Sequence, residues 1–144
     1  MQKLIPALLL VLFAFASCTK SDDTQAKVLN DTWYVAFYEA PEPGTVTPVD
    51  NTPEFAGYTF EFNDDNEWVI NSPANSTVNA YWSLENNGTT VKLKILDPDA
   101  VAPIDALVGT WDVLEQTNET LHLQKVPDVT QVDAAEIKIF FKKQ

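Results

Sequence analysis

Arginine is missing from this chain of 144 residues: all nine basic residues are lysines, 21 residues are acidic, and the formal net charge is -12. Proteins hold nucleic-acid phosphates with clustered lysine and arginine side chains, so a surface this acidic would repel DNA and RNA. Bidentate capture of a carboxylate or a phosphate also depends on the planar guanidinium group of arginine. The composition therefore excludes nucleic acid as a partner and predicts a solvated acidic surface.

Cysteine and histidine are almost as scarce, because Cys18 and His122 are the only ones in the sequence. A metal site usually needs several such ligands, and none can be assembled here. A Ser–His triad would have to be built on His122, and Cys18 lies near the N-terminus, just after an apolar run. Two carboxylates suffice for a glycosidase; Glu61 and Glu67 are the one candidate pair, although we interpret them as exterior charges. We predict no metal, no cofactor and no enzyme, with a carboxylate-based hydrolase as the exception.

The chain has a single long apolar run, from Leu4 to Ala16, just after Lys3. As a helix it would span about 20 Å, which is short of a hydrocarbon core of ~30 Å, so it is typical of a signal peptide rather than a membrane span. The run ends in Phe15-Ala16-Ser17-Cys18, which resembles a bacterial lipobox with Phe15 where leucine is preferred. The resemblance implies acylation of Cys18, with palmitate among the acyl groups; the alternative is a plain signal peptide with an incidental Cys18.

We accordingly divide the chain into a lipoprotein signal peptide (1–17), a polar tether (18–28) and one domain (29–144). Two or three acyl chains on Cys18 would hold the protein on a membrane. Lys20 followed by Asp22 and Asp23 resembles the surface-export signal of some Gram-negative lipoproteins. We therefore expect an outer-membrane lipoprotein that is exposed on the cell surface or faces the periplasm.

Apolar residues alternate with period two after Val28, as they do in half-buried strands. In the first segment Trp33, Val35 and Phe37 share one face. Eight segments follow this pattern: Thr32–Glu39, Tyr58–Phe62, Glu67–Asn71, Val78–Glu85, Val91–Ile95, Gly109–Gln116, Thr120–Lys125 and Glu136–Lys142. Short turns rich in Asn, Asp and Thr join most of them.

The fold class predicted from this pattern is all-β: a single antiparallel up-and-down barrel of about eight strands, which removes exposed strand edges. A β-sandwich is the alternative. Two connections are long, Ala40–Ala56 and Asp97–Val108, and Ile104–Val108 is expected to form a helical turn. Loops of such length are usually lids, binding loops or disordered segments.

The residues that open the first strand have a similar counterpart later in the chain. Leu29–Val35 reads Leu-Asn-Asp-Thr-Trp-Tyr-Val, and Leu107–Val113 reads Leu-Val-Gly-Thr-Trp-Asp-Val. Both resemble the Gly-x-Trp opening of lipocalins, and with Tyr58–Phe62 and Leu121-His122-Leu123 the chain is similar to lipocalin-like lipoproteins of Gram-negative bacteria. The resemblance covers roughly Leu29 to Val126 and implies a lipocalin/calycin-like barrel with a small apolar ligand inside.

Two positions depart from the lipocalin pattern. Asp31 stands where the first motif has glycine, and the last strand has no arginine to stack on the opening tryptophan. Lys138 and Lys142 are the residues of that strand that could take its place.

Alternation places one set of large side chains inside the barrel, where they either line a pocket for one ligand or fill the interior as core. The proposed ligand-binding residues are Trp33, Phe37, Tyr58, Phe60, Phe62, Trp68, Trp82 and Trp111. Val35, Ile70, Leu84, Leu93, Leu121, Leu123 and Phe141 are predicted to point inward with them. On the opposite faces lie Tyr34, Tyr38, Tyr81 and Phe140, either as a recognition patch or as ordinary surface aromatics.

Two functions follow from these alternatives. The first is a membrane-anchored protein that binds a small hydrophobic ligand in its barrel, with Ala40–Ala56 as a lid. The second is a surface interaction or structural protein whose barrel is filled and whose loops bind a protein or a glycan. The sequence leaves the ligand and the oligomeric state open.

Overall fold

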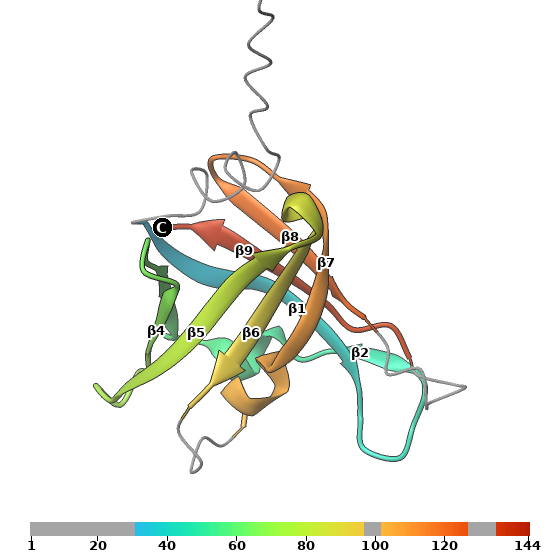
Figure 1. Cartoon of the computed structure of the whole chain (residues 1–144). Coiled ribbons are helices and arrows are strands. Elements are labelled where there is room, and N and C mark those ends of the chain that lie inside the picture. Colours follow the sequence, from blue (N-terminus) through green and yellow to red (C-terminus); the bar gives the residue numbers. More distant parts are fainter. Residues whose placement is uncertain (1–30, 97–101, 127–134) are drawn as a thin grey trace, which may run out of the picture.

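The computed structural model describes residues 31–96, 102–126 and 135–144, so the predicted signal peptide, Cys18 and the tether lie outside the described residues. The described chain forms one antiparallel sheet that closes on itself (Figure 1). Its strands are β1 (Thr32–Pro41), β2 (Pro48–Asp50), β3 (Thr59–Phe62), β4 (Glu67–Asn71), β5 (Thr77–Glu85), β6 (Thr90–Ile95), β7 (Gly109–Gln116), β8 (Thr120–Lys125) and β9 (Lys138–Lys143). Three short 3₁₀ helices join them: η1 (Thr52–Phe55), η2 (Asn86–Gly88) and η3 (Ile104–Leu107).

The predicted barrel is confirmed, and the sandwich is excluded, because β1 pairs with β9 and closes the sheet. Eight strands run up and down around the barrel in chain order, and the short β2 adds to the edge of β1. All eight predicted strands are present within a residue or two of their predicted ends. The predicted helical turn at Ile104–Val108 is present as η3.

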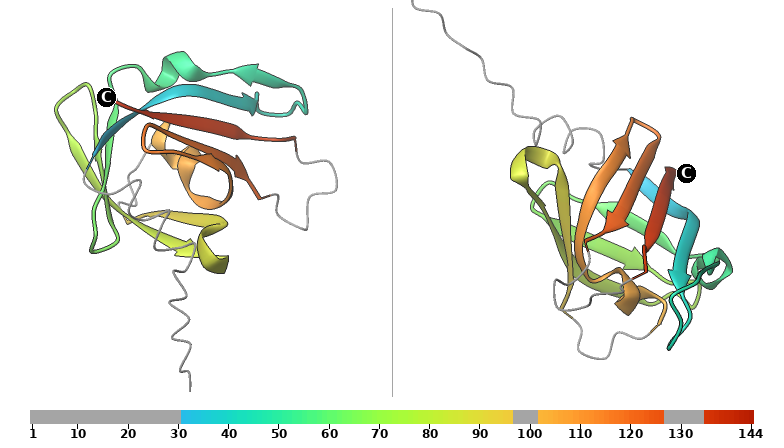
Figure 2. Two further views of the ribbon diagram at one scale, coloured as in Figure 1. Left: turned by 90° about the horizontal axis from the view of Figure 1, so that it is seen from above. Right: turned by 90° about the vertical axis from the view of Figure 1, so that its right-hand side faces the viewer.

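The two ends of the barrel differ in their connections (Figures 1 and 2). We call one the short-turn end: it carries the start of β1, the β3–β4 turn, η2, the β7–β8 turn and the C-terminus. We call the other the long-loop end: it carries β2, η1, η3 and the starts of β5, β7 and β9. Because an up-and-down barrel alternates its connections between two ends, the long connections collect at one of them.

Left-handed residues make the tight turns at the short-turn end. Asn66 has a φ of 66°, and Asn86, Asn87 and Gly88 have φ values of 52°, 57° and 76°. Asparagine and glycine tolerate this region better than other residues, which is why Asn-Asn-Gly predicts a hairpin here.

The long connection after β1 is packed against the barrel, which the sequence pattern does not predict. The amide N–H of Tyr38 donates to Oγ1 of Thr52 (2.8 Å), and the amide N–H of Asn51 donates to the carbonyl of Tyr38 (2.8 Å). Phe55 of η1 is buried and its ring contacts that of Tyr38 at 5.0 Å. β2 and η1 therefore continue the barrel wall beyond the point where β3 leaves β1.

A β-bulge at Ala36 corrects the predicted faces of β1. Val35 pairs with Phe141 and Phe37 pairs with Phe140, so Ala36 is an extra residue in β1. A bulge reverses which alternate residues face inward. Phe37 was predicted to point into the barrel and instead lies on the outer face, whereas Tyr38 was predicted to lie outside and is buried.

Candidate functional site

Five aromatic rings from four strands meet inside the barrel near the short-turn end. The Trp68 ring stacks on Phe60 and Phe62 with centroids 5.8 and 5.9 Å apart. Phe62 also meets Trp82 edge-on at 5.3 Å, and Phe141 contacts Phe60 at 5.2 Å. Centroids at these separations are in van der Waals contact. We call these five residues the ring cluster, and side chains rather than solvent fill this part of the barrel.

Most residues predicted to bind a ligand do face the interior. Trp33, Phe60, Phe62, Trp68, Trp82 and Trp111 are at most 2% exposed. Tyr58 is partly buried and packs against the same core. Phe37 is the exception, because the bulge turns its side chain outward, where it cannot line the interior. Whether the inward residues contact a ligand stays a prediction.

Two buried polar atoms in the described part of the chain have no hydrogen-bond partner, Nε1 of Trp68 and Oε1 of Gln116. Two other indoles differ: Nε1 of Trp82 donates to the carbonyl of Asn63 (3.0 Å), and Nε1 of Trp111 donates to that of Leu107 (2.9 Å). Gln116 pairs with the inward-facing Leu121, so its side chain points into the barrel. Leaving a buried polar group unpaired costs about 1–3 kcal/mol, so these two atoms are the weak points of an otherwise well-satisfied interior.

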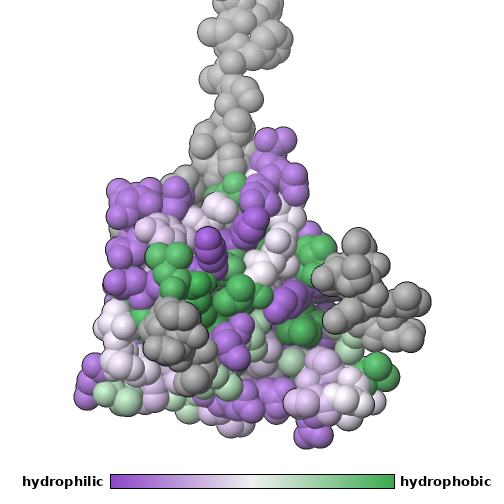
Figure 3. All heavy atoms as spheres, turned by 60° about the horizontal axis from the view of Figure 1, so that its bottom comes forward, coloured by the Kyte–Doolittle hydropathy of each residue, from purple (hydrophilic) through white to green (hydrophobic). Residues whose placement is uncertain are grey.

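The apolar interior is less completely covered at the long-loop end. Five of the seven partly buried hydrophobic side chains that pack against the core lie there: Tyr58, Val78, Ile95, Ala106 and Ile137. The other two, Leu84 and Val113, lie farther along β5 and β7 toward the short-turn end. Three neighbours of the strand ends are exposed outright, Leu96 (50%), Val108 (39%) and Val126 (39%). Hydrophobic side chains are visible together on this face of the molecule (Figure 3). We call the eight residues at the long-loop end the apolar rim.

A lysine lies among the residues of the rim. Lys125 follows the inward-facing Leu121 and Leu123 on β8, so its side chain starts on the inner face of the barrel. Its Nζ donates to the carbonyl of Ala106 (3.0 Å) and lies 5.4 Å from the centre of the Trp111 ring. Burial lowers the pKa of Lys125, and the nearby Asp105 carboxylate partly opposes that shift.

Lys138 and Lys142 were the predicted substitutes for the arginine that lipocalins stack on their opening tryptophan. Both lie on the outer face of β9, because their strand neighbours Ile139 and Phe141 point inward. A cation–π contact joins Lys125 to Trp111, the tryptophan of the second Gly-x-Trp-like segment.

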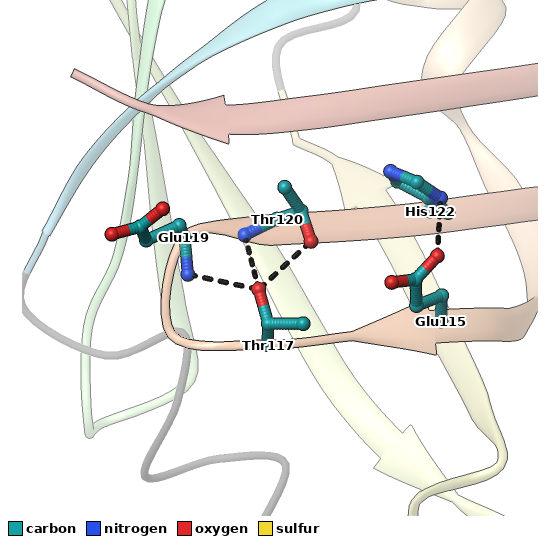
Figure 4. Close-up of polar contacts among 5 residues, drawn as sticks. All are labelled: Glu115, Thr117, Glu119, Thr120 and His122. Carbon is teal, nitrogen blue, oxygen red and sulfur yellow. Dashed lines mark hydrogen bonds and ion pairs between the residues drawn. The ribbon is translucent and has the colours of Figure 1, made fainter.

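On the outside of the barrel, one row of residues crosses four strands. The ring of Phe37 contacts that of Phe140 in a tilted arrangement at 5.1 Å, and Phe140 stacks on His122 at 4.1 Å. Nδ1 of His122 lies 3.2 Å from Oε2 of Glu115 (Figure 4). Beside this row, the amide N–H groups of Glu119 and Thr120 donate to Oγ1 of Thr117 and close the β7–β8 turn (Figure 4). Tyr34 lies nearby on the outer face, opposite Lys142.

The two carboxylates considered for hydrolysis lie on the outer faces of β3 and β4. Glu61 accepts a hydrogen bond from Asn71 (3.4 Å), whereas Glu67 accepts one from Asn63 (3.3 Å). Each carboxylate is thus held by a separate amide on the surface. Within residues 31–96, 102–126 and 135–144, no group of three or more His, Cys, Asp or Glu side chains could hold a metal ion. In those same ranges no helix has the length and hydropathy needed to cross a membrane.

Comparison with known proteins identifies the fold. No protein-family model matches the sequence, and no curated protein matches it significantly. Among solved structures, the chain is similar to a lipocalin-like protein from Bacteroides uniformis (TM-score 0.51, 15% identity), over 82% of this chain and 99% of the other. It is also similar to a DUF4847 family protein from Bacteroides vulgatus (TM-score 0.55, 14% identity), over 82% and 95% of the two chains. The fold is therefore lipocalin-like, as the resemblance in the sequence implies.

Proposed function

We propose that this lipocalin-like barrel is a membrane-anchored lipoprotein that binds a small hydrophobic ligand at its long-loop end. The observation that carries the proposal is the apolar rim. The five residues of the ring cluster are at most 2% exposed, but at the long-loop end eight apolar residues remain partly or fully exposed. Small-molecule sites are concave and mostly apolar with a few polar groups, and a rim of this kind around a barrel end suits one.

The ring cluster limits where such a ligand can lie. Phe62 contacts both Trp68 and Trp82 close to the short-turn end, which leaves no place for a ligand between these rings without repacking. The ligand of the proposal therefore lies between the rim and the ring cluster. Any polar atoms of the ligand would lie in the part of the barrel that can be reached from the long-loop end.

Acylation of Cys18 would orient the barrel relative to the membrane. The chain enters the barrel at the start of β1, which lies at the short-turn end. A tether leading from an acylated Cys18 therefore joins the barrel on the side opposite the rim. In this proposal the anchor lies in the outer membrane and the rim faces away from it, toward the medium or the periplasm.

The ring packing favours a second candidate function. If side chains fill the whole interior as they fill the ring cluster, the barrel is a scaffold with no room for a ligand. Its long loops or the outer Phe37–Phe140–His122 row would then bind a protein or a glycan. The two candidates differ in whether a hydrophobic molecule enters the barrel.

The ligand proposal is tested with two substitutions in one strand. Ile95 points inward at the rim, and the neighbouring Lys94 points outward. Ile95→Glu should abolish binding of a hydrophobic fluorescent probe and of any lipid carried by the purified protein in native mass spectrometry, whereas Lys94→Glu should leave both unchanged. A wild-type protein that carries no lipid and binds no probe would favour the filled scaffold.

Anchoring is tested separately. Cys18→Ser should abolish metabolic labelling with radioactive palmitate and move the protein from the membrane fraction to the soluble fraction, because the acyl chains supply the membrane affinity. Ser17→Ala, which keeps a small residue before the cysteine, is the matched control and should leave labelling intact. Equal labelling of the wild type and Cys18→Ser would contradict the lipobox interpretation.

A further inference from the structure

Lys125 combines an inward-facing strand position with the lack of a described ion-pair partner. Lys92, Lys138 and Lys143 lie beside carboxylates, with Nζ–O distances of 3.9 Å to Glu85, 2.7 Å to Glu136 and 2.6 Å to Asp31. Lys94 and Lys142 are exposed on outer faces. Lys125 and Lys143 both project from inward-facing strand positions, and Lys143 lies opposite Trp33. Lys143 is paired with Asp31, whereas no described carboxylate lies within ion-pair distance of Nζ of Lys125.

The strand next to Lys125 leaves room for its side chain. A Cβ atom at Gly109, at the start of β7, would lie 3.0 Å from Cε of Lys125. The aliphatic part of the lysine side chain therefore passes over a position of β7 that has no side chain. The stem ends at the Trp111 ring and at the last turn of η3. Nζ is therefore held at the long-loop end, beside the apolar rim residue Ala106.

The ammonium group retains unused hydrogen-bonding capacity. It has three N–H donors, and the described residues provide one acceptor, the carbonyl of Ala106. Its burial disfavours the charged form, and the exposed carboxylate of Asp105 offsets this only in part. An anion beside Nζ would both accept the remaining hydrogen bonds and compensate the charge, and such charge-assisted bonds are the strong ones.

We propose that Lys125 binds the anionic head group of a single-chain amphiphile whose apolar tail lies against the rim and the barrel interior. The inference rests on the proposed ligand-binding function and narrows it to one class of ligand. A carboxylate and a phosphate both provide the required chemistry, because an ammonium is a point charge that does not select between them by shape. The nearby carboxylate of Asp105 would repel a bound anion, so the site is not expected to bind anions in general strongly.

A purely structural role for Lys125 is the competing explanation. The contact with the Ala106 carbonyl caps η3, since a cation at the C-terminal end of a helix is favourable, and η3 covers the barrel. That role would not make binding depend on the charge of a ligand. The test therefore compares ligands that share a tail and differ in the head group.

The experiment titrates the wild-type domain at neutral pH, by isothermal calorimetry below the critical micelle concentration, with dodecanoate, dodecyl phosphate and dodecanol. We expect at least one of the two anions to bind about tenfold or more tightly than the alcohol, as one charge-assisted hydrogen bond allows. The anion that binds more tightly indicates the natural head group. The preference should disappear in Lys125→Met and Lys125→Gln and persist in Lys94→Met, with folding of each variant checked by near-UV circular dichroism.

Each remaining outcome has a definite meaning. Equal affinity of the wild type for the anions and the alcohol overturns the role of Lys125 and leaves the proposed function standing. Failure of all three ligands to bind overturns both. Because the wild-type preference is measured without any variant, the inference stays testable even if the Lys125 variants unfold.

Discussion

Ala36 and Leu114 are structurally equivalent: each is the bulge residue three positions after a fully buried tryptophan, Trp33 in β1 and Trp111 in β7. In both strands the residue before the bulge faces inward and the alternation then reverses. As a result Tyr38 and Gln116, two positions after their bulges, both point into the barrel. The two tryptophan segments, which are similar in sequence, thus also share a backbone bulge at the same position.

The bulge at Ala36 predicts the order of two substitutions. Tyr38→Ala should cost about 3–5 kcal/mol of unfolding free energy, because it leaves a cavity beside Phe55. Phe37→Ala should cost only about 0.5–1.5 kcal/mol, since it removes an outer-face contact with Phe140. Urea unfolding followed by tryptophan fluorescence measures both. Without the bulge the order would be reversed, and a larger loss for Phe37→Ala would contradict the register.

Trp111 and Trp68 provide a matched pair for a buried hydrogen bond. Both side chains are 0% exposed, but only the Trp111 indole has an acceptor, the carbonyl of Leu107. Replacement by phenylalanine removes similar volume at both sites. Trp111→Phe additionally orphans a buried carbonyl, so it should destabilise the protein by about 1–3 kcal/mol more than Trp68→Phe. Equal losses in urea unfolding would show that a partner for the Trp68 indole exists in solution.

Tyr38 should make the barrel sensitive to alkaline pH. Burial in the first place, then the charges of Glu54 and Asp105, raise its pKa above 10.0. A group with a raised folded-state pKa contributes stability that is present below its unfolded pKa and is lost as pH rises through the folded one. The wild type should therefore lose stability relative to Tyr38→Phe above about pH 10.

The comparison with Tyr38→Phe is needed because Lys125 acts in the opposite direction. Its lowered pKa means that the cost of burying the ammonium is relieved as pH rises toward 10.5, so this lysine adds stability up to that pH, in a range that overlaps the start of the Tyr38 effect. Measuring the melting temperature of both proteins from neutral pH to pH 11 cancels the Lys125 contribution. A difference between them that does not change with pH would contradict the prediction.

The strands could be predicted from the sequence because alternation and turn residues are local signals. Trp82 and Leu93, for example, alternate with polar neighbours along strands that have no irregularity, and both are buried. The bulge at Ala36 leaves no such signal, because Trp-Tyr-Val-Ala-Phe-Tyr is apolar on both faces and fits either register. Inward and outward positions in β1 are decided by pairing with β9, which lies a hundred residues away in the chain.

The candidate site was predictable only in part, for a related reason. Large aromatic residues indicate an interior, but which of them contact one another depends on the shape of the closed barrel. The sequence predicts a strand that ends at Lys125 and does not place this residue in the site, because a charged residue after Leu121 and Leu123 is typical of the end of an inward face. Its position follows from Gly109 on β7, and glycine gives no sign in a sequence of which partner crosses it.

Gly109 offers a test of that crossing. Its φ is +138°, and a Cβ atom would meet Lys125 at 3.0 Å; Gly44 also has a positive φ, +82°, but nothing lies within 4 Å of its Cβ position. Both alanine substitutions introduce backbone strain of about 1–3 kcal/mol. Only Gly109→Ala should also displace the lysine from the Trp111 ring, so it should lower the affinity for an anionic amphiphile while Gly44→Ala leaves it unchanged. If calorimetry finds the two variants equal in affinity, the path of Lys125 over Gly109 does not position the ammonium for a ligand.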